Sequence, residues 1–99
     1  MNMSTTAVQG SFFAQTDTAS DVYYELEERI AKANQRYGDF ASTHEAIGVA
    51  VEEWDELRDE IRANDLAAVE HECLDLAAVL VRLARMLRES NYTHLRSVK

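Results

Sequence analysis

Two pairs of carboxylates in this sequence have the spacing of a divalent metal site. Glu53 and Glu56 are three residues apart, as are Glu72 and Asp75. Residues three apart on a helix lie on neighbouring turns of one face, so each pair can direct its oxygens to a common point. Carboxylates that converge repel one another unless cations lie among them, and hard oxygen ligands suit Mg²⁺ or Mn²⁺. The four residues are therefore candidate metal ligands, provided that their two helices pack in antiparallel orientation.

Most acidic residues of a helical protein face solvent and bind no metal. We assign that surface role to three further acidic residues, which project away from the apolar stripe of their helix: Glu52, Asp55 and Asp59. Glu53 borders this stripe, whereas Glu56 taken alone resembles a surface residue. The pattern of this helix by itself does not decide whether Glu53 and Glu56 bind a metal or face solvent.

Glu72 is the acidic residue whose position most needs an explanation. Its neighbours on a helical wheel are apolar: Ala68, Leu76, Val79 and Leu83. Charged side chains are rarely buried unless a partner or a metal compensates them. Asp75 lies at the edge of the same face, and a salt bridge from this pair to an arginine is the alternative explanation. We favour metal binding over the salt bridge.

Other site chemistries fit the sequence less well. His71 precedes Glu72, but the zinc motif H-E-x-x-H fails because Asp75 stands where the second histidine is required. A di-iron carboxylate site favours a Glu-x-x-His pair with an inward-facing histidine, which we do not find. Cys73 lies in an apolar run without an electropositive setting, so we interpret it as a core residue and not as a nucleophile.

Three helices must position these carboxylates. The first is expected to start near Thr18–Asp21, which has a capping-box-like spacing, and to end at Gly38. Its apolar face consists of Val22, Leu26, Ile30, Ala33 and Tyr37. Residues 1–18, rich in Ser, Thr and Gln, are expected to form a flexible N-terminal arm.

The second helix is expected between two pairs of capping residues. Ser42 and Glu45 make a capping box at its start, and Asn64 and Asp65 end it and cap the third helix. Its apolar stripe consists of Ile47, Ala50, Trp54, Leu57 and Ile61. We expect Trp54 to serve core packing more than stacking on a nucleotide base.

The third helix is expected to run from about Leu66 to Glu89. Its middle, Cys73–Val81, is apolar nearly all round apart from Asp75, and such a helix is buried on several sides. A chain of 99 residues has too little protein to cover it alone. We therefore expect an all-α helical hairpin or half-bundle at residues 19–90, completed by homo-oligomerisation (a dimer or tetramer) into a four-helix-type bundle. Residues 91–99 read as a polar C-terminal tail.

The composition narrows the class of protein. The chain has no proline and only three glycines, which favours helices, and its net charge of −8 makes a nucleic acid duplex a poor partner. A lone cysteine fits a reducing compartment. No basic residue precedes Arg29 and no stretch approaches the roughly 20 apolar residues of a membrane helix, so we expect a cytoplasmic protein with no membrane partner.

The carboxylate motifs resemble those of a known family. The run Val51–Leu57, followed by Glu72-Cys73-Leu74-Asp75, resembles the MazG-like all-α NTP pyrophosphohydrolases, whose signature is E-x-x-E and then E-x-x-D about one helical hairpin later. Fifteen residues separate Glu56 from Glu72, which suits that pattern. The resemblance covers roughly residues 20–88, including segments similar to small single-domain and phage-type members. At Trp54 the sequence departs from the Gly-Glu-Leu or Ala-Glu-Leu of many relatives, a difference that bears on substrate preference.

The resemblance implies Mg²⁺-dependent hydrolysis of nucleoside triphosphates to a monophosphate and pyrophosphate, with Mn²⁺ as a substitute metal. The implied metal ligands are Glu53, Glu56, Glu72 and Asp75. Glu53 and Glu56 would also act in catalysis, with Glu53 or Glu52 positioning the attacking water. The candidate substrate-binding residues are Lys32, Arg36, Tyr37 and Arg82, with Arg85 as a further cation.

Two alternatives remain open at this point. A non-enzymatic helical dimerisation or interaction module would use the apolar third helix to associate and would show no dependence on a divalent metal. A family member that has lost its activity would keep the carboxylates without the reaction. Dependence on a divalent metal separates the first alternative from the enzyme.

Overall fold

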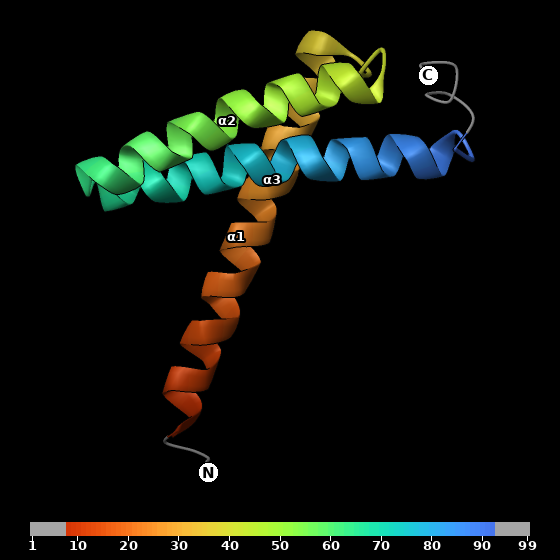
Figure 1. The fold of residues 1–99 in the computed structure, drawn as a ribbon. Coiled ribbons are helices and arrows are strands. Elements are labelled where there is room, and N and C mark those ends of the chain that lie inside the picture. Colours follow the sequence, from red (N-terminus) through yellow and green to blue (C-terminus); the bar gives the residue numbers. More distant parts are fainter. Residues whose placement is uncertain (1–7, 93–99) are drawn as a thin grey trace.

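The residues that the structure describes form three α helices and no strand. The computed structural model describes residues 8–92, with side chains from residue 18 onward. The helices are α1 (Val8–Tyr37), α2 (Thr43–Ala63) and α3 (Leu66–Glu89) (Figure 1). The predicted all-α class is confirmed, and the third helix has its expected bounds. No helix in this part of the chain combines the length and apolarity needed to span a membrane.

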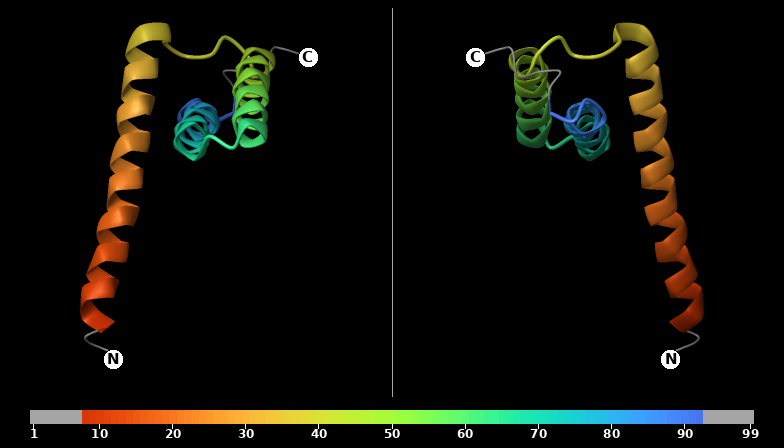
Figure 2. Two further views of the ribbon diagram at one scale, coloured as in Figure 1. Left: turned by 90° about the vertical axis from the view of Figure 1, so that its left-hand side faces the viewer. Right: turned by 90° about the vertical axis from the view of Figure 1, so that its right-hand side faces the viewer.

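The α3 helix lies between the other two. α2 and α3 run side by side as an antiparallel hairpin (Figure 1), and α1 crosses this hairpin on the α3 side (Figure 2). The N-terminal half of α1 extends away from the hairpin in both figures. Because α1 and α2 lie on opposite sides of α3, the outer face of α2 has no cover from the other described helices.

The ends of α2 and the start of α3 are capped as predicted. Ser42 Oγ accepts a hydrogen bond from the Glu45 backbone N–H at 3.1 Å, and the Glu45 carboxylate accepts one at 2.6 Å from the backbone N–H that precedes the cap. Asn64 ends α2 in the left-handed conformation at φ 59°. Asp65 Oδ1 then accepts a backbone hydrogen bond from the first turn of α3 at 3.1 Å. This short turn makes the hairpin antiparallel.

α1 begins earlier than the sequence predicts. It starts at Val8, so the expected start near Thr18–Asp21 is wrong and residues 8–18 of the expected arm are helical. The segment contains no proline to stop a helix, and extending an existing helix is easier than starting one. Residues 1–7, and residues 93–99 of the expected tail, lie outside the described part of the chain, and the flexibility of both termini stays a prediction. The other end of α1 agrees with expectation, since Gly38 has φ 70°.

The core is small and lies where α2 and α3 meet the α1–α2 connection. Its buried cluster consists of Phe40, Ala46, Val79 and Met86. Trp54 lies outside it with 47% of its surface exposed, so the predicted core position of this residue is wrong. Ile47 and Ile61 are exposed as well. The reason is rotation: α3 packs on the face of α2 that carries Ala46 and Leu57, where the small alanine allows close approach.

Candidate metal centre

Antiparallel packing of α2 and α3 brings three of the four predicted ligands together. Glu53 and Glu56 come from neighbouring turns of α2, and Glu72 comes from α3. Each offers one carboxylate oxygen, and these oxygens all lie within 4.8 Å of one another. Since Mg²⁺ binds oxygens at roughly 2.1 Å, small side-chain movements would let the three carboxylates share one cation.

Two oxygens of this cluster are buried and lack a donor. Glu53 Oε1 and Glu72 Oε1 have no hydrogen-bond partner within the described part of the chain. A buried carboxylate oxygen without a donor is costly unless a proton or a cation compensates it. Because all the ligand atoms of this cluster are hard oxygens, the cluster fits Mg²⁺ or Mn²⁺ and not a soft metal.

The crowding of these acids favours their protonated forms. Burial, followed by repulsion from the Asp75 and Glu56 carboxylates, raises the pKa of Glu53 to about 7. Burial also raises the pKa of Glu72. A divalent cation that binds carboxylates displaces their protons, so metal binding here is expected to strengthen as Glu53 ionises.

Asp75, the fourth predicted ligand, is held by an ion pair. Its Oδ1 lies 2.6 Å from Arg29 Nη1, and its Oδ2 lies 3.4 Å from His71 Nε2. The salt bridge to an arginine, which the sequence left open as the alternative for this residue, is thus present. Asp75 also stays close to the cluster, because its oxygen, one from Glu72 and a His71 nitrogen lie within 4.8 Å of one another.

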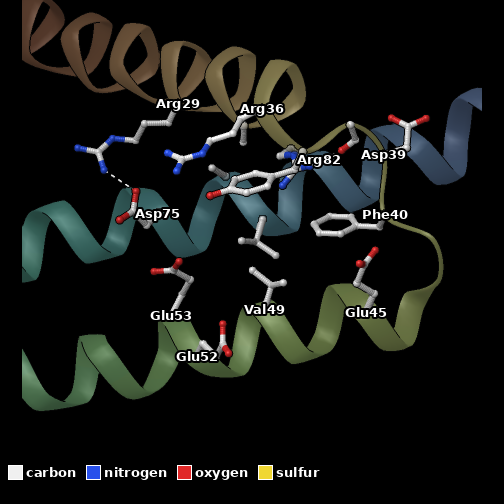
Figure 3. Close-up of a pocket in the computed structure, with 15 residues that line it drawn as sticks. Arg29, Arg36, Asp39, Phe40, Glu45, Val49, Glu52, Glu53, Asp75 and Arg82 are labelled. Carbon is white, nitrogen blue, oxygen red and sulfur yellow. Dashed lines mark hydrogen bonds and ion pairs between the residues drawn. The ribbon is translucent and has the colours of Figure 1, made fainter.

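A cleft of about 620 Å³ opens beside the carboxylates, a size within the usual range of small-molecule sites. Arg29 and Arg36 reach into it from α1, and Glu53 and Asp75 stand on the opposite wall (Figure 3). Of the three clustered carboxylates, Glu53 is the one that lines this cleft. A ligand in the cleft would therefore meet cationic side chains on one wall and acidic side chains on the other.

Of the three predicted substrate-binding residues on α1, two line the cleft and one does not. Arg36 and Tyr37 line the cleft, with the Arg36 guanidinium 5.4 Å from the centre of the Tyr37 ring. Tyr37 is 68% exposed, which leaves its ring accessible to a base. Lys32 is exposed and does not contribute to the cleft lining.

Arg82 borders the cleft but is engaged in holding the fold. It is buried, donates from Nε to Asn34 Oδ1 at 2.9 Å and from Nη2 to the Gly38 carbonyl at 2.8 Å, and stacks on Phe40 at 4.4 Å. These contacts fix the end of α1 to α3. Arg85 lies outside the cleft, in a two-bond pair with Glu27.

Arg29 is the site residue that the sequence reasoning missed. It lines the cleft and contacts Asp75, yet it lies in the acidic middle of α1, where a solvent-exposed role is the simplest interpretation. The signal that could have revealed it is its spacing from Arg36. Seven residues correspond to two helical turns, so the two arginines share one face of α1.

No protein-family model matches this chain, and no curated protein or solved structure matches it either. The function must therefore be inferred from the geometry and chemistry of the site itself.

Proposed function

We propose that this protein hydrolyses nucleoside or deoxynucleoside triphosphates to the monophosphate and pyrophosphate, with Mg²⁺ as cofactor and Mn²⁺ as a substitute, as the resemblance to MazG-like pyrophosphohydrolases implies. The observation that carries the proposal is the convergence of Glu53, Glu56 and Glu72 from two helices, with two buried oxygens that lack donors. The cationic wall of the adjacent cleft supports it, because a polyphosphate chain requires positive charge beyond that of its metal.

The three clustered carboxylates would hold the metal, and Asp75, which lies beside Glu72, would be a fourth ligand. When bound, the metal supplies charge neutralisation for the phosphates and lowers the pKa of a coordinated water. Glu53 faces the cleft and is the carboxylate best placed to accept the proton of a water that attacks the α-phosphorus. Attack forms the new P–O bond and breaks the α–β bridging bond, and pyrophosphate leaves with the bridging oxygen.

The α1 wall would bind the remainder of the substrate. The planar guanidinium of Arg36 suits bidentate contacts with phosphate oxygens, and Arg29 can act in the same way. Tyr37, next to Arg36 and largely exposed, is a stacking surface for the base. A stacking contact accepts any base, so this wall predicts broad base tolerance.

The test is pyrophosphate release from a panel of dNTPs and NTPs with Mg²⁺, with Mn²⁺ and with EDTA. Glu56→Gln and Glu72→Gln are expected to lower kcat about a hundredfold or more, because a lost ligand weakens both metal binding and charge stabilisation. Asp59→Asn is the matched control, since it removes one charge from an exposed position of the same helix. Absence of release from every nucleotide, with no rise in Tm on adding metal, would refute the proposal.

A second candidate function follows from the exposed face of α2. Four apolar residues on this face are exposed: Ile47, Val51, Trp54 and Ile61. Such a face favours association, so we propose a homo-oligomer, a dimer or tetramer that completes a four-helix-type bundle. The sequence favoured the third helix as the interface, but α3 lies between the other two helices, so α2 is the better candidate (Figure 2). If the protein forms this oligomer without metal-dependent hydrolysis, it is a helical dimerisation module and not an enzyme.

We place the protein in the cytoplasm, where a lone cysteine stays reduced.

A further inference from the structure

Arg29 reaches from α1 to α3 and forms an ion pair with Asp75, one of the predicted metal ligands. From α1 it donates to Asp75 on α3 at 2.6 Å (Figure 3). It also donates to the His71 backbone carbonyl at 3.2 Å. Its second terminal nitrogen lies 3.0 Å from His71 Nδ1. The guanidinium therefore lies against Asp75, the fourth predicted ligand, where a metal cation would have to approach that carboxylate.

A divalent cation that used Asp75 as a ligand would compete with this guanidinium for the same carboxylate. Asp75 shares a group of atoms within 4.8 Å with Glu72, which itself belongs to the Glu53–Glu56–Glu72 cluster. Both Asp75 oxygens already have a partner, at 2.6 Å from Arg29 and 3.4 Å from His71. A cation that takes Asp75 as a ligand must displace the guanidinium or accept repulsion from it.

The Arg29 side chain has room in the cleft to move away from Asp75. Its side chain is 24% exposed and lines the cleft, in contrast to Arg82, which is buried and fixed by two hydrogen bonds and a stacked ring. Arg36 lies on the same face of α1 and already points into this space. A rotation of the Arg29 side chain would turn its guanidinium away from Asp75 and toward the guanidinium of Arg36.

We infer that Arg29 exchanges partners during ligand binding. Without nucleotide it holds Asp75 and weakens the metal site; when a triphosphate enters the cleft, Arg29 moves to the phosphates and releases Asp75 to the metal. This inference rests on the proposed function, since it concerns the same metal and the same substrate. It makes metal and nucleotide binding mutually reinforcing, because each ligand removes a contact that opposes the other.

The decisive measurement is Mn²⁺ binding without nucleotide, followed by electron paramagnetic resonance of the unbound ion. Arg29→Gln is expected to bind Mn²⁺ about five- to tenfold more tightly than the wild type, a change on the scale of a partly exposed ion pair and a nearby like charge. The same variant is expected to bind an α,β-methylene deoxynucleoside triphosphate more weakly at saturating Mg²⁺. Arg29→Lys keeps the charge and should leave Mn²⁺ affinity near the wild-type value.

Glu27→Gln is the matched control for this experiment. It breaks the other ion pair between α1 and α3, the contact with Arg85 at 2.7 Å, without touching the carboxylate cluster. If Arg29 only fastens the two helices together, Arg29→Gln and Glu27→Gln will lower Tm alike and neither will tighten Mn²⁺ binding.

Unchanged or weaker Mn²⁺ binding by Arg29→Gln would overturn the inference while leaving the proposed hydrolysis intact. Tighter Mn²⁺ binding by that variant, with no pyrophosphate release from the wild type, would support the competition and refute the proposed reaction. Absence of Mn²⁺ binding by both proteins would remove the metal centre and the inference with it.

Discussion

At the scale of single residues, Glu53 links the charge of the site to the stability of the fold. Its pKa of about 7 lies above the ordinary value of 4.5, because the side chain is partly buried among other carboxylates. The folded protein therefore retains a proton that the unfolded chain releases between these two values. The stability due to this proton is fully present below pH 4.5 and is lost as the pH rises through about 7.

We therefore expect the Tm of the metal-free protein to fall between pH 5 and pH 8, measured by circular dichroism in EDTA. Glu53→Gln should flatten this dependence, because a neutral amide neither releases a proton nor repels its neighbours. Saturating Mg²⁺ should flatten it as well, since the cation replaces the proton. Asp59→Asn should keep the wild-type slope, and an equal loss of slope in this surface variant would contradict the assignment to Glu53.

Arg82 illustrates how a cation beside a site can serve the fold. It connects α3 to Asn34 and to the Gly38 carbonyl at the end of α1. Arg82→Met is expected to destabilise the protein by about 2 kcal/mol or more, because two hydrogen-bond acceptors lose a charged donor. Urea unfolding measures this change. Arg85→Gln, which removes an exposed pair on the same helix, should have little effect.

At the scale of the elements, the α2–α3 turn sets the register of the carboxylates. Asp65 caps α3 with a hydrogen bond at 3.1 Å, directly after the left-handed Asn64. This geometry reverses the chain within two residues, and it is the reason that Glu72 meets Glu53 and Glu56. The carboxylate cluster therefore depends on a capping residue, Asp65, that is not one of the clustered acids.

Asp65→Ala is expected to lower the free energy of unfolding by about 1 kcal/mol through loss of the cap. Metal affinity should weaken in parallel, because the register of the hairpin becomes less well defined. Asp65→Ser retains a capping oxygen and should restore most of both values. A variant that loses stability but keeps full Mn²⁺ affinity would show that the register does not depend on the cap.

At the scale of the whole molecule, one side of α2 has no cover from the other helices that the structure describes. Trp54 is the only tryptophan of the chain and is 47% exposed on this side, close in sequence to the candidate ligands Glu53 and Glu56. An apolar face of this kind on so small a protein is expected to associate. The same helix would then carry the metal site on one face and the subunit interface on the other.

Trp54 fluorescence is therefore expected to shift to shorter wavelength as the protein concentration rises, in step with a larger mass in sedimentation equilibrium. Val51→Ser, which keeps the tryptophan, should move both transitions to higher concentration because it weakens the same face. Tyr24→Ser removes an exposed ring from α1 instead and should change neither. Monomers at all concentrations would refute the proposed oligomer.

The sequence by itself determined the helices and most of their ends. Periodicity, the absence of proline, and the caps at Ser42 and Asp65 are local properties, so they predict α2 and α3 without knowledge of the rest of the chain. The spacing of the acidic pairs is local too, and it identified the three carboxylates that come together, whereas Asp75, the fourth, pairs with Arg29. The start of α1 at Val8 was missed because weak helix signals are decided by propagation from a stable neighbour.

Only the tertiary structure decided which face of each helix is covered and which charges meet. Trp54 was expected in the core, but the rotation of α2 against α3 exposes it and buries Ala46, together with Leu57 from the predicted stripe. The pairing of Arg29 with Asp75 joins residues 46 positions apart and depends on how α1 crosses α3. Such contacts are fixed by packing and by the desolvation of charged groups, and neither is encoded in the spacing of residues along one helix.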